Sequence, residues 1–328
     1  MKNITEKGRS ATLGISSKYL RIVIFYLTFY SGPMRDGKDQ RVPDSPDEER
    51  IAWHPAFFEA IQMELEEYGQ ELQFITEYPL TTEPLRIDVV IIKKFKNIPI
   101  KKNIATIFRK ENIAEYKSPE DYVSIDDFYQ VYAYACLYKV LNKVDIRDLT
   151  LTFVGSRYPR ELIAHFEGVR GYLIEEKSPG IYNIKGDILP IQIIDSRKLS
   201  AEENIWLKAL DNRLKAPEIR RVTGEIARQG KAARIKAYLD AIMKANKESL
   251  LEALKMSDTQ LTLDKVFEEA GLVAKWEAKG EARGIAKGED QKASEIARNM
   301  LKNGFSLEET SKLSGLDITK VRLLSDSL

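Results

Sequence analysis

The chain has 328 residues, 43% hydrophobic and 31% charged, which is enough for one sizeable core and a smaller second module. Its 51 Lys and Arg residues nearly balance its 50 Asp and Glu residues, so any attraction to nucleic acid must come from local clusters of charge. The single cysteine, Cys136, excludes an internal disulfide and a cysteine-built zinc site, and two histidines are too few to suggest a histidine-based metal centre. No G-x-x-x-x-G-K-[ST] phosphate loop occurs, so ATP hydrolysis has no support.

Near the N-terminus, basic residues precede the apolar run Ile22 to Tyr30, which imitates a secretion signal. The run is much shorter than the ~20 residues that span a bilayer, and no small-x-small cleavage pattern follows it cleanly. We therefore expect no membrane segment, and we hypothesise that Met34 is the native start. Residues 34–50 lack an apolar period and read as a flexible lead-in.

The first predicted helix covers Trp53 to Tyr68, where apolar residues recur at helical spacing. On a helical wheel, Glu64 lies beside this apolar stripe and Glu59 lies nearly opposite it. A strand over Leu72 to Leu80 and a turn at residues 81–84 follow.

A second strand, Leu85 to Ile92, is rich in β-branched residues and contains one acid, Asp88. Apolar neighbours suggest burial on both faces, where an unpaired carboxylate is costly. Asp88 therefore needs a cationic partner or a metal ion, unless it lies at the exposed end of the strand.

The next strand, Asn112 to Pro119, alternates so that Glu115 and Lys117 share one face. Two carboxylates on adjacent strands can hold Mg²⁺, which prefers oxygen ligands. A lysine beside them can orient a water molecule and offset the charge that develops on a phosphate during hydrolysis. Acid followed by acid-x-lysine thus fits metal-assisted cleavage of a phosphodiester, although acid-x-lysine alone is frequent by chance.

The helix predicted from Ile125 to about Leu141 contains Gln130 and Tyr134, which one helical turn separates, so both can face the site. They also fit ordinary polar positions on an amphipathic helix. We expect Cys136, on the apolar side of this helix, to be a core residue.

Seven basic residues lie between the second and third strands: Lys93, Lys94, Lys96, Lys101, Lys102, Arg109 and Lys110. Such a run is usually a solvated loop. If it lies next to the proposed metal site, it can instead bind phosphates without regard to sequence.

After the predicted helix at 125–141, the apolar pattern predicts a strand over residues 149–154, a helix over 160–166, a hairpin over 171–184 and a last strand over 189–194. Beyond residue 201 the pattern predicts helices alone, over residues 201–215, 222–229, 232–245 and 247–254. Residues 274–298 form a highly charged segment in which Gly280, Gly284 and Gly288 are spaced by four. Ser306 to Glu309 fits a capping box and Gly315 a helix stop, which together resemble a helix-turn-helix. Such a hairpin either enters a DNA groove or, more often, packs.

In order and spacing, Asp88 and Glu115-Tyr116-Lys117 resemble the motif of the PD-(D/E)XK nuclease superfamily, with Ile87 in place of its proline. Gln130-x-x-x-Tyr134 is similar to an element of its RecB-like branch, and with the C-terminal tail the pattern resembles the Rpn family of recombination-promoting nucleases and putative transposases. The resemblance implies an α/β fold with an α-β-β-β-α-β core, followed by an all-helical C-terminal region. It implies Mg²⁺ (or Mn²⁺) held by Asp88, Glu115 and a helical acid, for which we prefer Glu64 with Glu59 as the fallback, and it implies catalytic roles for Lys117, Gln130 and Tyr134.

We expect four segments: a lead-in (1–50), a nuclease-like domain (51–200), a helical region (201–279) and a charged helix with the helix-turn-helix-like end (280–328). The resemblance implies a cytoplasmic, Mg²⁺-dependent DNA endonuclease of the mobile-element type. The alternative is a catalytically inactive scaffold that binds DNA or forms a homo-oligomer through its C-terminal helices.

Overall fold

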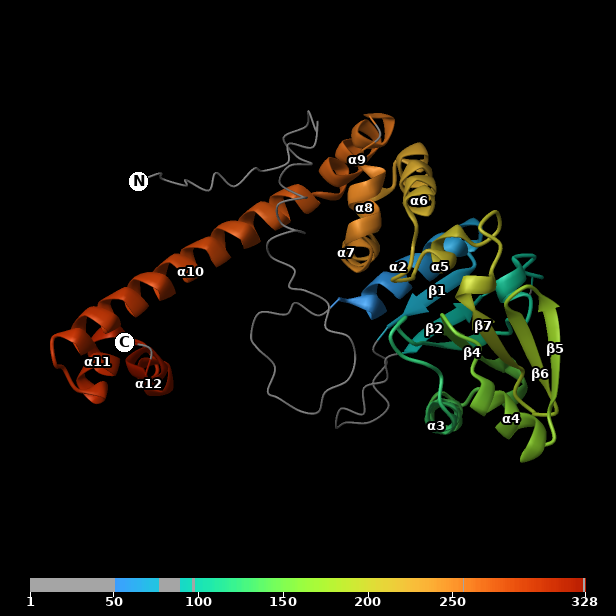
Figure 1. The fold of residues 1–328 in the computed structure, drawn as a ribbon. Coiled ribbons are helices and arrows are strands. Elements are labelled where there is room, and N and C mark those ends of the chain that lie inside the picture. Colours follow the sequence, from blue (N-terminus) through green and yellow to red (C-terminus); the bar gives the residue numbers. More distant parts are fainter. Residues whose placement is uncertain (1–50, 77–88, 96–97, 256, 327) are drawn as a thin grey trace. The chain divides into compact units, whose positions relative to one another are not determined.

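The structure is a computed structural model, and it describes residues 51–76, 89–95, 98–255, 257–326 and 328 (Figure 1). These residues form a mixed α/β structure around a seven-stranded mixed sheet, which confirms the α/β class expected from the sequence. The predicted lead-in, the turn at residues 81–84 and Asp88 lie outside the described residues.

The strands run in the order β1-β2-β3-β4-β7-β6-β5 across the sheet. Their bounds are β1 (Leu72–Ile75), β2 (Val89–Lys94), β3 (Glu111–Tyr116), β4 (Leu149–Gly155), β5 (Leu173–Ser178), β6 (Ile181–Lys185) and β7 (Ile191–Asp195). β3, β4 and β7 are parallel to one another, whereas the remaining neighbours pair antiparallel. The predicted hairpin around Gly180 is the β5-β6 pair.

The described residues contain the following α-helices: α2 (Trp53–Glu64), α3 (Ile125–Asn142), α4 (Arg160–Gly168), α5 (Ile205–Lys208), α6 (Ala216–Gln229), α7 (Lys236–Ala245), α8 (Lys247–Ala253), α9 (Ser257–Ala270), α10 (Leu272–Lys302), α11 (Leu307–Ser314) and α12 (Ile318–Asp326). The prediction of a helix over residues 201–215 is wrong, because only the four residues of α5 form an α-helix there. None of the described helices combines the length and the hydrophobicity needed to cross a bilayer.

The described residues separate into two compact units, one ending at Gly271 and the other beginning at Leu272. The expected boundary at residue 200 lies inside the first unit, since α5 to α9 belong with the sheet. In the second unit, Ala297 of α10 packs with Leu316 and Val321 in a small core. Its predicted capping box at Ser306 and its helix stop at Gly315, with φ of 74°, are confirmed.

The two faces of the sheet carry different helices, because side chains alternate along each strand. On one face, Ile113 of β3 packs in a cluster with Phe128 and Val131 of α3. On the other face, Tyr116 of β3 stacks on Phe57 of α2, with ring centroids 4.7 Å apart. Residues 111, 113, 115 and 117 therefore lie on the α3 face of the sheet.

Candidate functional site

Glu115 and Lys117 lie together at the carboxyl end of β3, on the α3 face. The Nζ atom of Lys117 is 3.4 Å from an Oε1 atom of Glu115. Glu115 is paired in register with Val89 of β2, the residue that follows Asp88 in the sequence. On its other side, the backbone N–H of Lys117 donates to the carbonyl of Val154 on β4, at 2.9 Å. The end of the acid-x-lysine segment is thus fixed between two neighbouring strands.

A third residue of this cluster is Asp127 in the first turn of α3. Its Oδ1 atom is 2.8 Å from the Nζ of Lys117. Its Oδ2 atom accepts from the backbone N–H of Ser124 at 2.8 Å, and the Ser124 hydroxyl in turn accepts from the N–H of Asp127, which forms a capping box. Sequence reasoning missed Asp127, although the Ser-x-x-Asp pattern at the start of the predicted helix was a signal for it.

Lys117 and Asp127 each stabilise the charged form of the other. Burial opposes the charge on Lys117, but the hydrogen bond that it donates to Asp127 and the nearby carboxylates of Glu115, Asp127 and Asp121 raise the Lys117 pKa above its ordinary value. Burial also opposes the charge on Asp127, but hydrogen bonds from Lys117 and Ser124 lower its pKa. Lys117 is therefore held as an ammonium ion and Asp127 as a carboxylate at neutral pH.

Contacts at both ends fix α3 along β3. Near the start of β3, Glu111 accepts a hydrogen bond of 2.7 Å from the hydroxyl of Tyr138, whereas Lys117 and Asp127 pair at the other end. The eleven helical steps between the two α3 residues cover about 16 Å, and the six strand steps cover about 20 Å, so helix and strand match in length.

Gln130 and Tyr134 lie on the stretch of α3 between these two contacts. The amide Nε2 of Gln130 donates to the hydroxyl of Tyr134 at 2.7 Å, so the two side chains contact each other as their spacing predicted. Gln130 is exposed and Tyr134 is half-buried. No described hydrogen bond joins either of them to Glu115 or Lys117.

The structure does not bring Glu64 to this cluster. Glu64 is buried on α2, where one carboxylate oxygen is 2.7 Å from the Nζ of Lys102. The other oxygen accepts from the backbone N–H groups of Trp206 and Leu207, at 2.8 and 3.0 Å. Burial raises the Glu64 pKa against the opposing effect of Lys102. Glu64 thus joins α2 to the start of α5, on the sheet face opposite Glu115.

Glu59, the fallback acid, has a similar role one turn earlier on α2. It accepts from the backbone N–H of Tyr238 in the first turn of α7, at 2.7 Å. Its burial raises its pKa, and the backbone hydrogen bonds partly oppose that shift. Both acids of α2 therefore satisfy the free N–H groups at the starts of later helices.

Lys93 and Lys110, two described residues of the basic run between β2 and β3, do not lie next to Lys117. In an antiparallel pair, the carboxyl end of β2 and the amino end of β3 meet at the same edge, and Lys93 pairs in register with Glu111 there. Lys110 forms an ion pair with Asp148 at that edge, at 2.6 Å. Lys93 and Lys110 are therefore one strand length from Lys117, which does not favour the alternative in which the run binds phosphates beside the proposed metal site.

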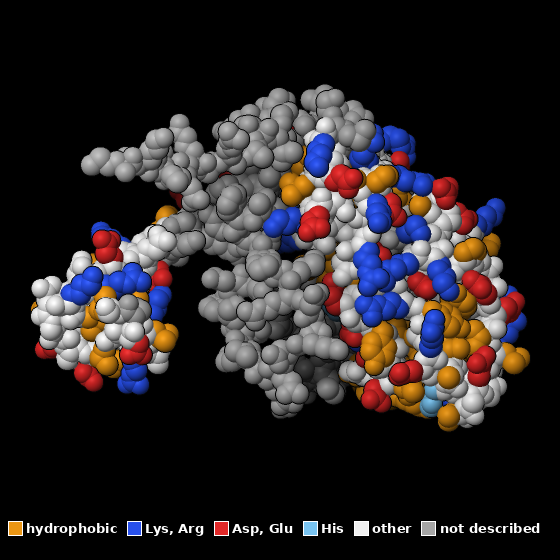
Figure 2. Space-filling model, in the orientation of Figure 1, with side chains coloured by type: hydrophobic (Ala, Val, Ile, Leu, Met, Phe, Trp, Pro, Cys, Tyr) orange, Lys and Arg blue, Asp and Glu red, His pale blue; other side chains and the backbone are white. Residues whose placement is uncertain are grey.

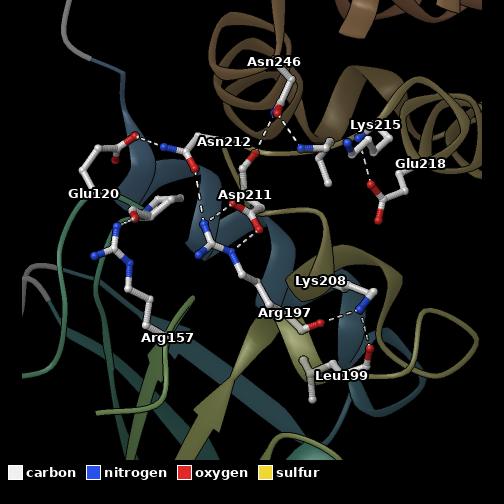
Figure 3. Close-up of polar contacts among 12 residues, drawn as sticks. Glu120, Arg157, Arg197, Leu199, Lys208, Asp211, Asn212, Lys215, Glu218 and Asn246 are labelled. Carbon is white, nitrogen blue, oxygen red and sulfur yellow. Dashed lines mark hydrogen bonds and ion pairs between the residues drawn. The ribbon is translucent and has the colours of Figure 1, made fainter. Parts of the chain in front are cut away.

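Cations follow the carboxyl ends of all three parallel strands, with Arg157 after β4 and Arg197 after β7. Figure 3 shows Arg197 bonded to both carboxylate oxygens of Asp211, at 2.5 and 2.6 Å. Arg157 is exposed, and its Nη2 donates to the carbonyl of Pro119 at 3.3 Å, two residues beyond Lys117 (Figure 3). Sequence reasoning missed these cations at the ends of the strands. The Ser-Arg pairs at residues 156–157 and 196–197, each directly after a strand, were a signal for them.

Among the described residues, no group of three or more His, Cys, Asp or Glu side chains is arranged to hold a metal ion. Glu115, beside Lys117, is a described oxygen donor that fits the proposed site, and Asp88 lies outside the described residues. No family model, curated protein or solved structure matches this chain.

Proposed function

We propose that this chain is a metal-dependent nuclease that hydrolyses phosphodiester bonds in DNA at the carboxyl end of β3. The observation that supports it is the register of β2 and β3. It pairs Val89 with Glu115, and it thereby sets the residue that follows Asp88 opposite an acid whose neighbour is Lys117. Two acids and a lysine from adjacent strands are the groups that this chemistry needs.

In this proposal Asp88 and Glu115 hold Mg²⁺ or Mn²⁺. The ion supplies activation of water and charge neutralisation at the phosphate. Lys117 orients the attacking water and stabilises the charge that develops on the phosphate oxygens. Asp127 positions the ammonium group of Lys117 and keeps it protonated. Gln130 and Tyr134 then hold the edge of the site or a substrate phosphate.

The proposal requires the carboxylate of Asp88 to lie on the face of the sheet that carries Glu115. Asp88 lies outside the described residues, and Val89, the residue that follows it, pairs in register with Glu115. The requirement is tested by the Asp88→Ala variant below.

The arrangement of elements supports the proposed family. A helix, an antiparallel β-meander, a second helix and a strand parallel to the third follow one another as α2, β1, β2, β3, α3 and β4. We propose that this is a PD-(D/E)XK core and that β5 to β7 extend it. On the same grounds we propose a relation to the Rpn family, with helices that follow the core.

The test is cleavage of supercoiled plasmid by the purified protein with Mg²⁺, Mn²⁺, Ca²⁺ or EDTA. We expect Asp88→Ala, Glu115→Gln and Lys117→Ala each to lower the rate about a hundredfold or more. Matched controls come from the exposed ion pair of the β5-β6 hairpin, Glu175→Gln and Lys185→Ala, which should cleave like the wild type.

Two outcomes would count against the proposal. Equal cleavage by the wild type and by all three site variants would identify a contaminating nuclease. Absence of cleavage of both duplex and single-stranded DNA by the wild type, with every divalent metal, would show that the protein is not a nuclease of this kind.

A non-catalytic scaffold is the second candidate, and one observation favours it. The Lys117 network joins β3 to the capping box of α3, which is a structural role that needs no metal. A scaffold of this kind would shift DNA in gels equally with Mg²⁺ and with EDTA, and it would not cut it.

A further inference from the structure

The outer face of α3 carries a stripe of exposed apolar side chains. Val140 is 66% exposed, Leu141 55%, Leu137 42% and Tyr129 41%. Cys136, which the sequence led us to expect in the core, is exposed on this face. Figure 2 shows hydrophobic side chains gathered on the surface over α3 and α4.

The stripe follows from the helical repeat. Phe128, Val131, Ala135 and Tyr138 are the buried side of α3, which packs on the sheet. At 100° per residue, the exposed apolar residues fall on the opposite side of the helix. A helix that is apolar on two opposite sides is typical of a buried element. Single exposed hydrophobic residues need no explanation, but a continuous stripe marks an interaction site.

The apolar surface continues past the N-terminal part of α3. The hydroxyl of Tyr129 is 2.9 Å from Nε2 of His165 on α4, which places the two helices in contact. Just beyond α4, Val169 is 73% exposed, and Leu173 at the start of β5 is 70% exposed. The surface is therefore wider than one helix.

We propose that this surface binds the same surface of a second copy of the chain, with the two α3 helices antiparallel. The charges at the helix ends support this partner. Asp126 lies in the first turn of α3, Lys139 in its last turn and Lys143 at its C-cap. An antiparallel pair sets the acidic end of each helix near the basic end of the other and aligns the helix dipoles favourably. A two-fold dimer of this kind uses one patch twice.

The dimensions of the surface indicate a weak dimer. The stripe from Tyr129 to Leu141 is about 18 Å long. The two α3 helices at the centre of this surface bury less than the ~800 Å² per partner of a standard interface. We therefore expect a dissociation constant in the micromolar range, which corresponds to a binding free energy of about −8 kcal/mol. This proposal does not depend on the proposed nuclease activity.

Cys136, the single cysteine, provides a direct test because it lies near the midpoint of the stripe. Packed helices are 8–10 Å apart, so a short bismaleimide should join two copies through Cys136. We expect a covalent dimer from the wild type and none from Cys136→Ser. The orientation is tested by the double variant Cys136→Ser, Tyr129→Cys. In the antiparallel pair its two cysteines are about 18 Å apart and should not be joined, and efficient joining would overturn this orientation.

Sedimentation equilibrium from about 1 to 100 μM protein gives the affinity, a range chosen to bracket a micromolar constant. We expect Val140→Glu and Leu137→Glu each to weaken the dimer at least tenfold, because each introduces an unpaired charge into the interface. The matched control is Leu313→Glu on α11, which is equally exposed at 66% but lies outside this surface. A wild type that remains monomeric throughout, or glutamate variants that dimerise like the wild type, would overturn the proposal. Circular dichroism establishes that the variants are folded.

Discussion

The substitution Asp127→Asn tests the charge cluster on which the proposed site depends. An asparagine retains the shape of the side chain and an oxygen that can accept from Ser124, so the helix cap survives. It removes the negative charge 2.8 Å from the ammonium of Lys117. The variant therefore isolates the ion pair from the capping box that shares the same residue.

The magnitude follows from the surroundings of the pair. Both side chains are 19% exposed, so the pair is screened less than a surface ion pair. Hydrogen bonds to charged groups contribute about 1.5–3 kcal/mol, and we expect Asp127→Asn to lower the free energy of unfolding by about 2 kcal/mol. Asp127→Ala, which also removes the cap, should lower it by about 3 kcal/mol. For a unit of this size, 2 kcal/mol corresponds to a fall in Tm of about 4–8 °C.

The dependence on pH distinguishes an ion pair from other causes. The folded-state pKa of Asp127 is lowered, so its stabilisation is present above the ordinary value of 3.8 and is lost as the pH falls below it. The pKa of Lys117 is raised, so its stabilisation is present below 10.5 and is lost as the pH rises beyond that value. The difference between wild type and Asp127→Asn should therefore be constant near neutral pH and shrink at both extremes.

Urea unfolding followed by circular dichroism measures this difference across the pH range. Asp126→Asn is the matched control, because Asp126 lies in the same helical turn and is exposed, and it should change the free energy of unfolding by less than about 1 kcal/mol. If Asp127→Asn were as stable as the wild type at pH 7, or if a difference of 2 kcal/mol persisted at pH 3, the ion-pair reasoning would be refuted.

Four further substitutions test the packing. Tyr116→Phe should stabilise the protein by about 1 kcal/mol in urea unfolding, because the buried Tyr116 hydroxyl has no hydrogen-bond partner among the described residues. Gly180→Ala should lower the free energy of unfolding by about 3 kcal/mol, because φ is +82° and a Cβ would lie 2.6 Å from the carbonyl oxygen of Asp195. Gly171→Ala is its control and should lower it by about 1 kcal/mol, because φ is +64° but a Cβ there would meet open space. Asp187→Asn should lower the free energy of unfolding by about 3 kcal/mol, because this 3% exposed carboxylate accepts from two tyrosine hydroxyls, an arginine and a backbone amide.

Local patterns predicted the elements well where they were strong. The Ile125 helix begins at the predicted residue, and the strand at 149–154 is extended by only one residue. The run of charged and small residues beyond 201 was ambiguous, because good helix formers also occur in irregular segments that tertiary contacts hold in place. Residues 201–215 are mostly irregular for this reason. The side chain of Asn246, from beyond α7, binds the backbone at Asp211 and Leu214 (Figure 3).

The site shows the same division between local and long-range information. Alternation along one strand sufficed to place Glu115 and Lys117 on one face, and helical spacing sufficed to bring Gln130 to Tyr134. The sequence left the position of the basic run open, because that position depends on which ends of β2 and β3 meet, a property of sheet pairing that spacing along the chain does not contain. Cys136 was misplaced because α3 is apolar on two sides, and the apolar pattern cannot indicate which side faces the sheet.

The two acids of α2 show why a buried acid in a sequence does not identify its partner. The helical wheel placed Glu64 beside the apolar stripe, and Glu64 is indeed buried. A buried carboxylate must be compensated, and a metal ion, a cation and the free N–H groups of a helix start all do so. Glu64 uses the last two, and the N–H groups come from residues more than 140 positions later in the chain. A carboxylate predicted to be buried therefore becomes evidence for a metal only when a second donor from another element is known to converge on it. In the proposed site, Asp88 is this second donor for Glu115. Glu64 instead contacts a lysine and two backbone N–H groups.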